Sequence, residues 1–272
     1  MSDVVLLGRP PVARSKTRRA LTQLGLLAAV PVALIVVWWL VATIADSSVI
    51  AGPLDALEQV EASLKSARYR ASMLTTVQTV VTAYIGAVVI GGLVGFSLGL
   101  SPFWRSAVGP LVQGIYSIPK ITIFPLFLVF LGLSLTSRTA FAFVHGFFPM
   151  VIIIIIMGAT ENLRMSEIYL KLGASLRMSY LQLVRMVLLP AVLPSFLTAA
   201  RLAFGLTFLG AILAEMFTTN GGLGHELVRN LFLVRIDRIL GQVAVIAILA
   251  IIPNAILRLL EVRVTRRMQG QS

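Results

Sequence analysis

Cysteine is absent from this chain of 272 residues, and charged residues make up only 12% of it. Without cysteine, disulfides and thiolate metal sites are excluded. The low charge content excludes an ordinary soluble domain of this length, in which roughly a quarter of the residues would be charged. Acidic residues are especially few, 11 against 23 lysines and arginines, and the formal net charge is +12.

Motifs for covalent chemistry are missing as well. The two histidines, His145 and His225, are far apart in the sequence, and no HExxH motif is present. The chain has no G-x-S-x-G nucleophile turn. It also lacks the GxxxxGK[ST] phosphate loop, so we expect no ATP hydrolysis by this chain alone. These absences argue against an intramembrane enzyme and predict no catalytic residue, bound cofactor or metal in this chain.

Long apolar runs are what the sequence does contain. Hydrophobic residues make up 58% of the chain, with a mean hydropathy of +0.94. A helix crosses the hydrocarbon core with about 20 residues, and continuous runs differ from the alternation of barrel strands. We therefore predict an all-α membrane protein with about six transmembrane helices. The predicted spans are Leu21–Ile44, Met73–Leu100, Val108–Leu135, Ala140–Ala159, Ala191–Phe217 and Ile239–Leu260.

Six spans place the loops and termini on two sides of the membrane, and the basic residues are distributed unevenly between these two sides. The side with both termini and the loops after the second and fourth spans holds most of the cations and few acids. Positive residues near span ends mark the cytoplasmic side, so we predict cytoplasmic N- and C-termini. Orientation and contact with anionic lipid explain the basic excess better than nucleic acid binding.

We divide the chain into four parts. They are a basic N-terminal tail (1–20), the first transmembrane helix with an outer amphipathic segment (21–72), a membrane core (73–260) and a basic C-terminal tail (261–272). Within the core, residues 161–190 are mostly polar, but their apolar residues recur at helical spacing. This pattern predicts an amphipathic helical unit in the cytoplasm.

Two outer connections are also long. Asp46–Ser72 contains the turn signal Gly52-Pro53, followed by leucine and valine spacing that predicts a short amphipathic helix on the outer surface. Thr218–Arg238 begins with a glycine-rich stretch, and we predict a flexible connection there.

Glycine and proline mark two of the spans. Gly91, Gly95 and Gly99 form a ridge at four-residue spacing, which predicts close helix packing within one subunit or across a dimer. Pro119 should break or kink the third span beside Lys120. Both a structural kink and a lining role in a pathway are compatible with this break.

Two charged residues lie inside the fifth span. Arg201 and Glu215 are too far apart to pair within one helix, since their separation corresponds to about 21 Å. Arg201 could snorkel to the cytoplasmic surface, and Glu215 could accept hydrogen bonds from Gly221–Gly224. For both residues, a stabilising role is favoured over a gating or substrate role.

Several local sequences together resemble the transmembrane permease subunits of bacterial ABC importers of type I. The resemblance extends from about Ile50 to Arg266 and is nearest to the group for aliphatic sulfonates, taurine and nitrate. It is carried by Gly114–Lys120, Phe124-Pro125-Leu126, Phe147-Phe148-Pro149, Leu189–Pro194 and Ala214–Met216 before Gly222–Gly224.

In that family the cytoplasmic segment before the Leu-Pro pair contains an EAA triplet, and a glycine lies thirteen residues before the proline. Counting back from Pro190 places Arg177 at the glycine and Lys171-Leu172-Gly173 at the triplet. Aligning Gly173 with the glycine instead makes the spacing to Pro190 four residues too long. The resemblance implies an ATPase-coupling role for Lys171, Leu172, Gly173, Ala174, Ser175, Leu176, Arg177, Met178, Ser179, Tyr180, Leu189 and Pro190.

The resemblance further implies a homodimeric permease in a bacterial inner membrane. Its partners would be two ABC ATPase subunits, which bind ATP and Mg, and an extracytoplasmic solute-binding protein. The implied function is alternating-access import of a small solute, such as an organic sulfonate or nitrate. Pro119, Lys120, Arg201 and Glu215 are the candidates for a pathway or gating role. Alternatives are a stand-alone secondary transporter or channel and a purely structural membrane anchor.

Overall fold

The structure is a computed structural model. It describes residues 29, 32–44, 52–100, 102–160, 171, 173, 175–183, 185, 186, 189–218 and 221–268. Every regular element in these residues is a helix. This agrees with the predicted all-α class, because a helix satisfies its own backbone groups in hydrocarbon.

Nine helices carry labels in the part of the chain that the structure describes. They are α2 (Pro53–Lys65), α3 (Ala67–Leu100), α4 (Pro102–Ser117), α5 (Lys120–Leu131), α6 (Leu135–Thr160), α8 (Tyr180–Leu183), α9 (Leu189–Met216), α10 (Leu223–Phe232) and α11 (Ile236–Met268). A shorter apolar helix precedes them at Val32–Ile44.

Among the described residues, 4 helices are long and apolar enough to cross a membrane, namely α3, α6, α9 and α11. The pair α4 and α5 would make a fifth span, but the two helices meet at an angle of 87°. The predicted third span is thus two helices, and it begins earlier than expected, at Pro102. Of the predicted first span, Leu21–Ile44, only residues 29 and 32–44 are described.

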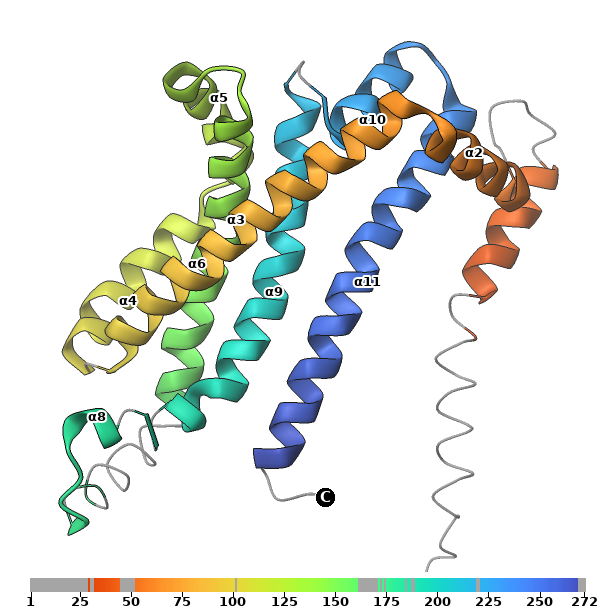
Figure 1. The fold of residues 1–272 in the computed structure, drawn as a ribbon. Coiled ribbons are helices and arrows are strands. Elements are labelled where there is room, and N and C mark those ends of the chain that lie inside the picture. The colour runs from red at the N-terminus through yellow and green to blue at the C-terminus, as the bar shows by residue number, and fades with distance from the viewer. Residues whose placement is uncertain are drawn as a thin grey trace, which may run out of the picture.

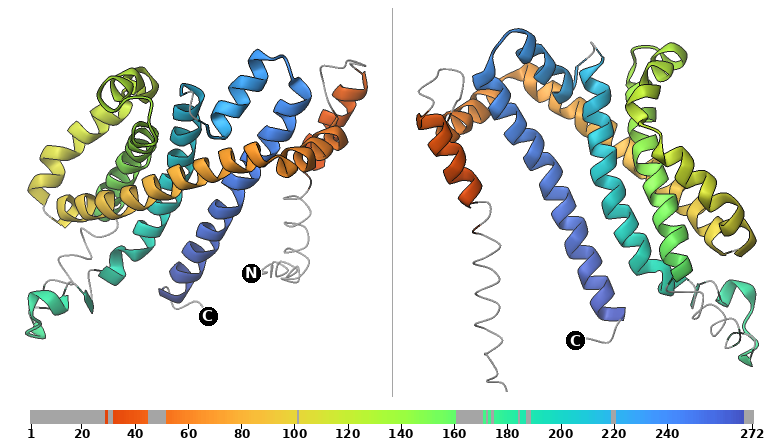
Figure 2. Two further views of the ribbon diagram at one scale, coloured as in Figure 1. Left: turned by 45° about the horizontal axis from the view of Figure 1, so that its top comes forward. Right: turned by 180° about the vertical axis from the view of Figure 1, so that it is seen from behind.

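Helix α6 lies in the middle of the bundle, packed against α3 on one side and α9 on the other (Figure 1). Helix α3 crosses the whole bundle, from α2 at one end to α4 at the other (Figures 1 and 2). Alanines make up much of the α6–α9 contact, where Met150 and Ile154 pack against Ala199, Ala200 and Ala203. Small residues at such a contact allow the two backbones to approach closely.

Helix α11 stands on the other side of α9 and is held mainly by α2, α9 and α10. A Cβ placed on Gly241 would lie 2.8 Å from the Cβ of Gln59, so α11 and α2 are in close contact there. Apolar side chains further along α11, such as Ile251 and Leu259, are exposed. An exposed apolar surface of this extent suits a helix that faces lipid.

The two outer connections are more ordered than the sequence suggests. Helix α2 is present as predicted, but it packs on α11 and α3 through Ala56, whereas Leu54 and Leu57 remain exposed. The prediction of a flexible Thr218–Arg238 connection is wrong for the residues of α10. The glycine-rich stretch is the start of this helix, and its first N–H groups bind side chains of α3 and α9.

Candidate coupling site and pathway

The structure describes the middle of the coupling segment that the sequence predicts. Positions 171, 173 and 175 are helical, and α8 follows after a turn. Helix α8 lies at the same end of the bundle as the last turn of α11 (Figure 1). Outside the described part are Leu172, Ala174 and the side chains of Tyr180, Leu189 and Pro190, although Leu189 and Pro190 begin α9.

A left-handed residue ends the first helical piece. Arg177 has a φ of 50°, and the N–H of Met178 donates to the carbonyl of Gly173 at 2.9 Å. This bond across a left-handed position is the Schellman ending of a helix, in which glycine is preferred at the left-handed position. Counting back thirteen residues from Pro190 aligns Arg177 with the glycine of the family pattern. Arg177 therefore has the left-handed backbone conformation that suits a glycine at this position.

Gly173 makes a close contact within the same segment. Its position is buried, and a Cβ added there would lie 2.6 Å from Cδ1 of Leu183. The side chain of Leu183 is itself buried. Leu183 thus packs α8 directly against the preceding helical piece, and a larger residue at position 173 would require the Leu183 side chain to shift.

Helix α8 begins with a reciprocal cap. The N–H of Ser179 donates to Oε1 of Gln182 at 2.9 Å, and the N–H of Gln182 donates to Oγ of Ser179 at 3.4 Å. This capping box satisfies two backbone donors that the short helix leaves unpaired. Together with the Schellman ending, it makes the segment a folded unit with a defined shape.

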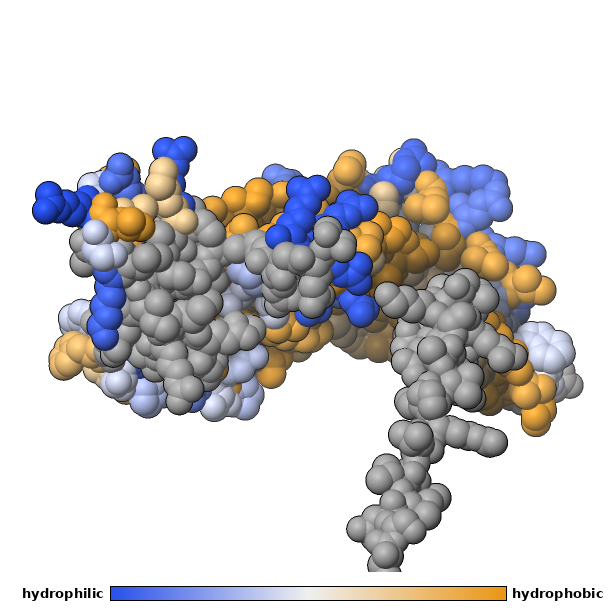
Figure 3. Space-filling view, turned by 90° about the horizontal axis from the view of Figure 1, so that it is seen from below, coloured by the Kyte–Doolittle hydropathy of each residue, from blue (hydrophilic) through white to orange (hydrophobic). Residues whose placement is uncertain are grey.

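The unit carries exposed apolar side chains together with exposed basic ones. Leu176, Leu181 and Met186 are 62%, 75% and 65% exposed, and Arg177 and Arg185 are exposed as well. We call these five residues the coupling face. Viewed from this end of the molecule, hydrophilic residues gather in separate groups with apolar surface between them (Figure 3). Exposed apolar anchors with neighbouring arginines are typical of a surface that a partner protein covers.

The break in the third span is centred on Pro119. Ser117 ends α4, Pro119 caps α5, and Lys120 is the first residue of α5. The Nζ of Lys120 lies 3.8 Å from the ring centre of Tyr116 and donates to the Tyr116 carbonyl at 3.1 Å. Its charge is therefore held at the break by a ring face and by a carbonyl that the break has freed.

Arg201 is paired across helices instead of snorkelling. Its Nε lies 2.6 Å from Oε2 of Glu261 on α11, and the Thr198 hydroxyl donates to Oε1 of the same carboxylate at 2.6 Å. Both charged side chains are largely buried, at 25% and 16% exposure. This contact fastens α9 to α11 near the end where α8 lies.

Glu215 is completely buried at the other end of α9. Its Oε2 accepts a hydrogen bond from the Thr76 hydroxyl at 2.8 Å and from the Gly224 N–H at 3.1 Å, the latter as expected from the sequence. The Leu223 N–H donates to Thr76 Oγ1 at 2.8 Å. Arg138 of α6 donates to the Gly221 carbonyl at 2.8 Å. The start of α10 is thus joined to α3, α6 and α9.

The predicted glycine ridge of α3 faces α6 of the same chain. A Cβ on Gly91 would lie 3.0 Å from Cβ of Met150, and one on Gly95 would lie 3.1 Å from Cβ of Ile154. Gly99 is less confined, with its nearest neighbour at 3.8 Å.

Two further close contacts between α6 and α9 were not singled out from the sequence. A Cβ on Gly210 would lie 2.7 Å from the His145 ring, and Gly146 faces Thr207. These glycines are isolated in the sequence, so no spacing pattern marks them.

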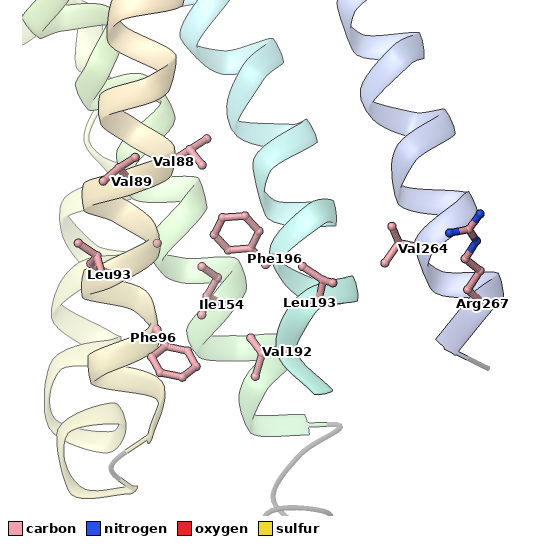
Figure 4. Close-up of a pocket in the computed structure, with 11 residues that line it drawn as sticks. Val88, Val89, Leu93, Phe96, Ile154, Val192, Leu193, Phe196, Val264 and Arg267 are labelled. Atoms are coloured by element: carbon pink, nitrogen blue, oxygen red, sulfur yellow. The ribbon is translucent and has the colours of Figure 1, made fainter. Parts of the chain in front are cut away.

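An apolar cavity of about 890 Å³ lies between α3, α6, α9 and α11. Val264 of α11 faces Leu193 of α9 across it, and Phe196 and Ile154 close its inner side (Figure 4). Arg267 is the one charged residue among the lining residues described. Because the walls offer almost no polar groups, this cavity is poorly suited to recognising a small polar solute.

Comparison with known proteins places these features in one family. Residues 87–270 match the family model described as the binding-protein-dependent transport system inner membrane component. The chain is 27% identical over 257 residues to the taurine transport system permease protein TauC of Escherichia coli, covering 92% of this chain and 90% of that protein.

Two further relatives match over shorter regions. The formylaminopyrimidine transport permease protein ThiX of Halalkalibacterium halodurans is 33% identical over 137 residues, covering 49% of this chain and 53% of that protein. The nitrate import permease protein NrtB of Synechococcus elongatus is 29% identical over 153 residues, covering 56% of this chain and 53% of that protein. Since the family model matches more than half of the chain, this protein belongs to the inner membrane components of binding-protein-dependent transport systems, the permeases of ABC importers.

Proposed function

We propose that this permease imports a small oxyanion, such as an organic sulfonate or nitrate, and that a separate ATPase subunit drives it through the coupling face. ATP and Mg would bind to that subunit, since this chain has no phosphate loop. The coupling face is the observation on which the proposal rests. It presents Leu176, Leu181 and Met186 on a folded unit whose shape is fixed by its own contacts.

The coupling face is connected to the membrane-spanning helices, and this connection supports the proposal. Leu189 follows closely after α8 and begins α9, which packs along α6 and is joined to α11 through Arg201 and Glu261. Movement of the segment by an ATPase would therefore act on α9, α6 and α11 as packed rigid bodies. Alternating access by rigid-body motion of packed helices requires this kind of connection.

The solute class is supported by the relatives and by one cation. Two of the relatives are named for taurine, which carries a sulfonate group, and for nitrate, which is an oxyanion. Lys120 holds a positive charge at the break between α4 and α5, where a passing anion could replace the Tyr116 carbonyl as its partner. We assign Pro119 and Lys120 to the pathway, and we assign Arg201 and Glu215 to structural contacts.

The assembly that we propose contains two copies of this chain, two ATPase subunits and a solute-binding protein outside the membrane. The coupling face would lie in the cytoplasm with both termini. The family name supports a binding-protein partner and an inner-membrane location. The basic residues of α11, Arg263, Arg266 and Arg267, suit the proposed cytoplasmic side.

A stand-alone secondary transporter is less well supported. Such a transporter needs a carboxylate that is free to take up the coupling ion. The described carboxylates of the four long spans are Glu215 and Glu261, and both are engaged with neighbouring helices. Glu261 cannot bind an ion without disturbing its contacts with Arg201 and Thr198, and Oε2 of Glu215 is already engaged by Thr76 and Gly224.

Affinity purification of the chain from native membranes tests the proposal. We expect an ABC ATPase subunit to be recovered with the wild type, and ATP-dependent uptake after reconstitution with a binding protein. Uptake that persists without any ATPase and collapses with the ion gradient would instead identify a secondary transporter.

A further inference from the structure

A second, polar pocket of about 260 Å³ lies at the end of the bundle opposite α8. It is formed by α2, the first turn of α3, α10 and the first turns of α11, which come together at the top of Figure 1. Pockets for drug-sized ligands occupy about 300–1,000 Å³, so this one suits a smaller molecule. It is far from the coupling face and from the break at Pro119.

The described residues that line this pocket carry a net positive charge. Arg68, Arg229 and Arg238 line it together with one described carboxylate, Glu226. Glu226 lies 2.8 Å from Nε of Arg68 and 3.4 Å from a terminal nitrogen of Arg229. Among the described lining residues, three guanidinium groups thus accompany one carboxylate, and guanidinium groups bind oxyanions through paired hydrogen bonds.

Four buried polar atoms of the lining residues have no hydrogen-bond partner within the described protein. Two can donate, the Tyr69 hydroxyl and Nε of Arg229, and two accept, Oδ1 of Asn230 and Oε1 of Gln242. The side chains of Tyr69, Asn230 and Gln242 are only 4%, 2% and 3% exposed. Buried polar groups are nearly always paired, and leaving them unpaired is costly. Four such atoms around one pocket leave it with both donors and acceptors for a ligand.

We propose that this pocket binds a small oxyanion that also carries hydrogen-bond donors, of the phosphoethanolamine type. The oxyanion would accept from Arg229, Arg238 and Tyr69, while the ammonium group would donate to Asn230 and Gln242. The same chemistry occurs in a free metabolite and in the headgroup of phosphatidylethanolamine. Because the walls of the pocket come from α2, α3, α10 and α11, the bound ligand would hold these helices together.

Binding to the purified full-length chain in detergent tests the proposal without any transport measurement. Isothermal titration with O-phosphoethanolamine should show saturable binding at one site per chain, accompanied by a rise in Tm. Phosphocholine has the same phosphate but no N–H donors, so it should bind at least about tenfold more weakly, because the hydrogen bonds to Asn230 and Gln242 are lost. Absence of saturable binding at millimolar O-phosphoethanolamine, or equal binding of the two compounds, would overturn the proposal.

A matched pair of variants locates the site. Arg238→Gln removes an exposed pocket cation and should weaken binding about tenfold or more. Arg235→Gln removes a neighbouring exposed arginine that does not line the pocket, and binding should be unchanged. Equal losses in the two variants would mean that the compound binds elsewhere.

The lipid composition distinguishes the two sources of the ligand. In nanodiscs of phosphatidylethanolamine, a bound headgroup should prevent O-phosphoethanolamine from binding, whereas nanodiscs of phosphatidylcholine should leave the pocket accessible. Equal binding in the two lipids would assign the site to a free metabolite. Transport activity does not enter these measurements, so they succeed or fail independently of the proposed import function.

Discussion

Leu183 occupies the space that a side chain at position 173 would need, since a Cβ on Gly173 would lie 2.6 Å from its Cδ1. This contact holds α8 against the preceding helical piece and so determines the shape of the coupling face. Gly173 leaves room for this contact at a position where the family pattern has an alanine of the EAA triplet. Its consequences for the bound ATPase can be tested by substitution.

Gly173→Ala should loosen the coupling segment. The added methyl group displaces Leu183, and overpacking of this kind costs about 1–3 kcal/mol. We expect weaker association with the ATPase subunit and slower ATP-dependent uptake, with the chain still present in the membrane at wild-type amounts.

Gly205→Ala is the matched control, because Gly205 is also helical and a Cβ there meets nothing within 4 Å. It should leave transport unchanged and stabilise α9 slightly, by roughly 0.5–1 kcal/mol. If the two variants lose uptake equally, the Leu183 contact has no special role in coupling.

Arg177→Gly should be tolerated or stabilising, because Arg177 has a φ of 50°. Relief of the left-handed conformation contributes about 1–2 kcal/mol. Arg177→Val removes the same charge but places a β-branched residue in that conformation. We expect the glycine variant to keep more ATPase binding and uptake than the valine variant. Equal activity of the two would show that the turn does not matter.

Gly222→Ala should destabilise the fold more than Gly221→Ala. Both residues have positive φ, 102° and 93°, so both variants carry the same backbone penalty. Only at Gly222 would the new methyl group meet the buried Glu215 carboxylate, whereas nothing lies within 4 Å at Gly221. The difference in Tm between the two purified variants measures the Glu215 contact, and identical Tm values would contradict it.

The Arg201–Glu261 pair should show a measurable coupling energy between α9 and α11. In a double-mutant cycle with Arg201→Leu and Glu261→Gln, we expect about 1 kcal/mol of interaction, because the pair is partly buried and in direct contact. The losses in Tm of the two single variants should together exceed the loss in the double variant. Strict additivity would indicate that the two side chains act independently.

The sequence predicts the helical class and the family well, because apolar runs and the Leu-Pro and glycine motifs are local features. It also places Glu215 near Gly221–Gly224 correctly, since both lie at one end of a single span. It fails for α10, where the glycine-rich stretch suggests flexibility. What orders this helix is Thr76 on α3, which is distant in the sequence.

Contacts between distant helices are what the sequence does not reveal. The partner of Arg201 lies on α11, and the glycines that accommodate His145 and Thr207 follow no spacing rule. The polar pocket combines residues from four helices, and each of them alone resembles an ordinary surface residue. Local patterns specify which segments are helices, whereas the pairing of their side chains depends on the packed bundle.

The most direct test of the account is the affinity of the cognate ATPase subunit for the chain after a charge is placed on the coupling face. Leu181→Asp puts a carboxylate on a side chain that is 75% exposed, and Leu231→Asp does the same on α10, at the opposite end, where the leucine is 57% exposed. We predict that Leu181→Asp weakens ATPase binding at least about tenfold, as for a central apolar anchor, and abolishes ATP-dependent uptake, while Leu231→Asp leaves ATPase binding intact. Unchanged ATPase binding and uptake in Leu181→Asp would contradict the assignment of the coupling face.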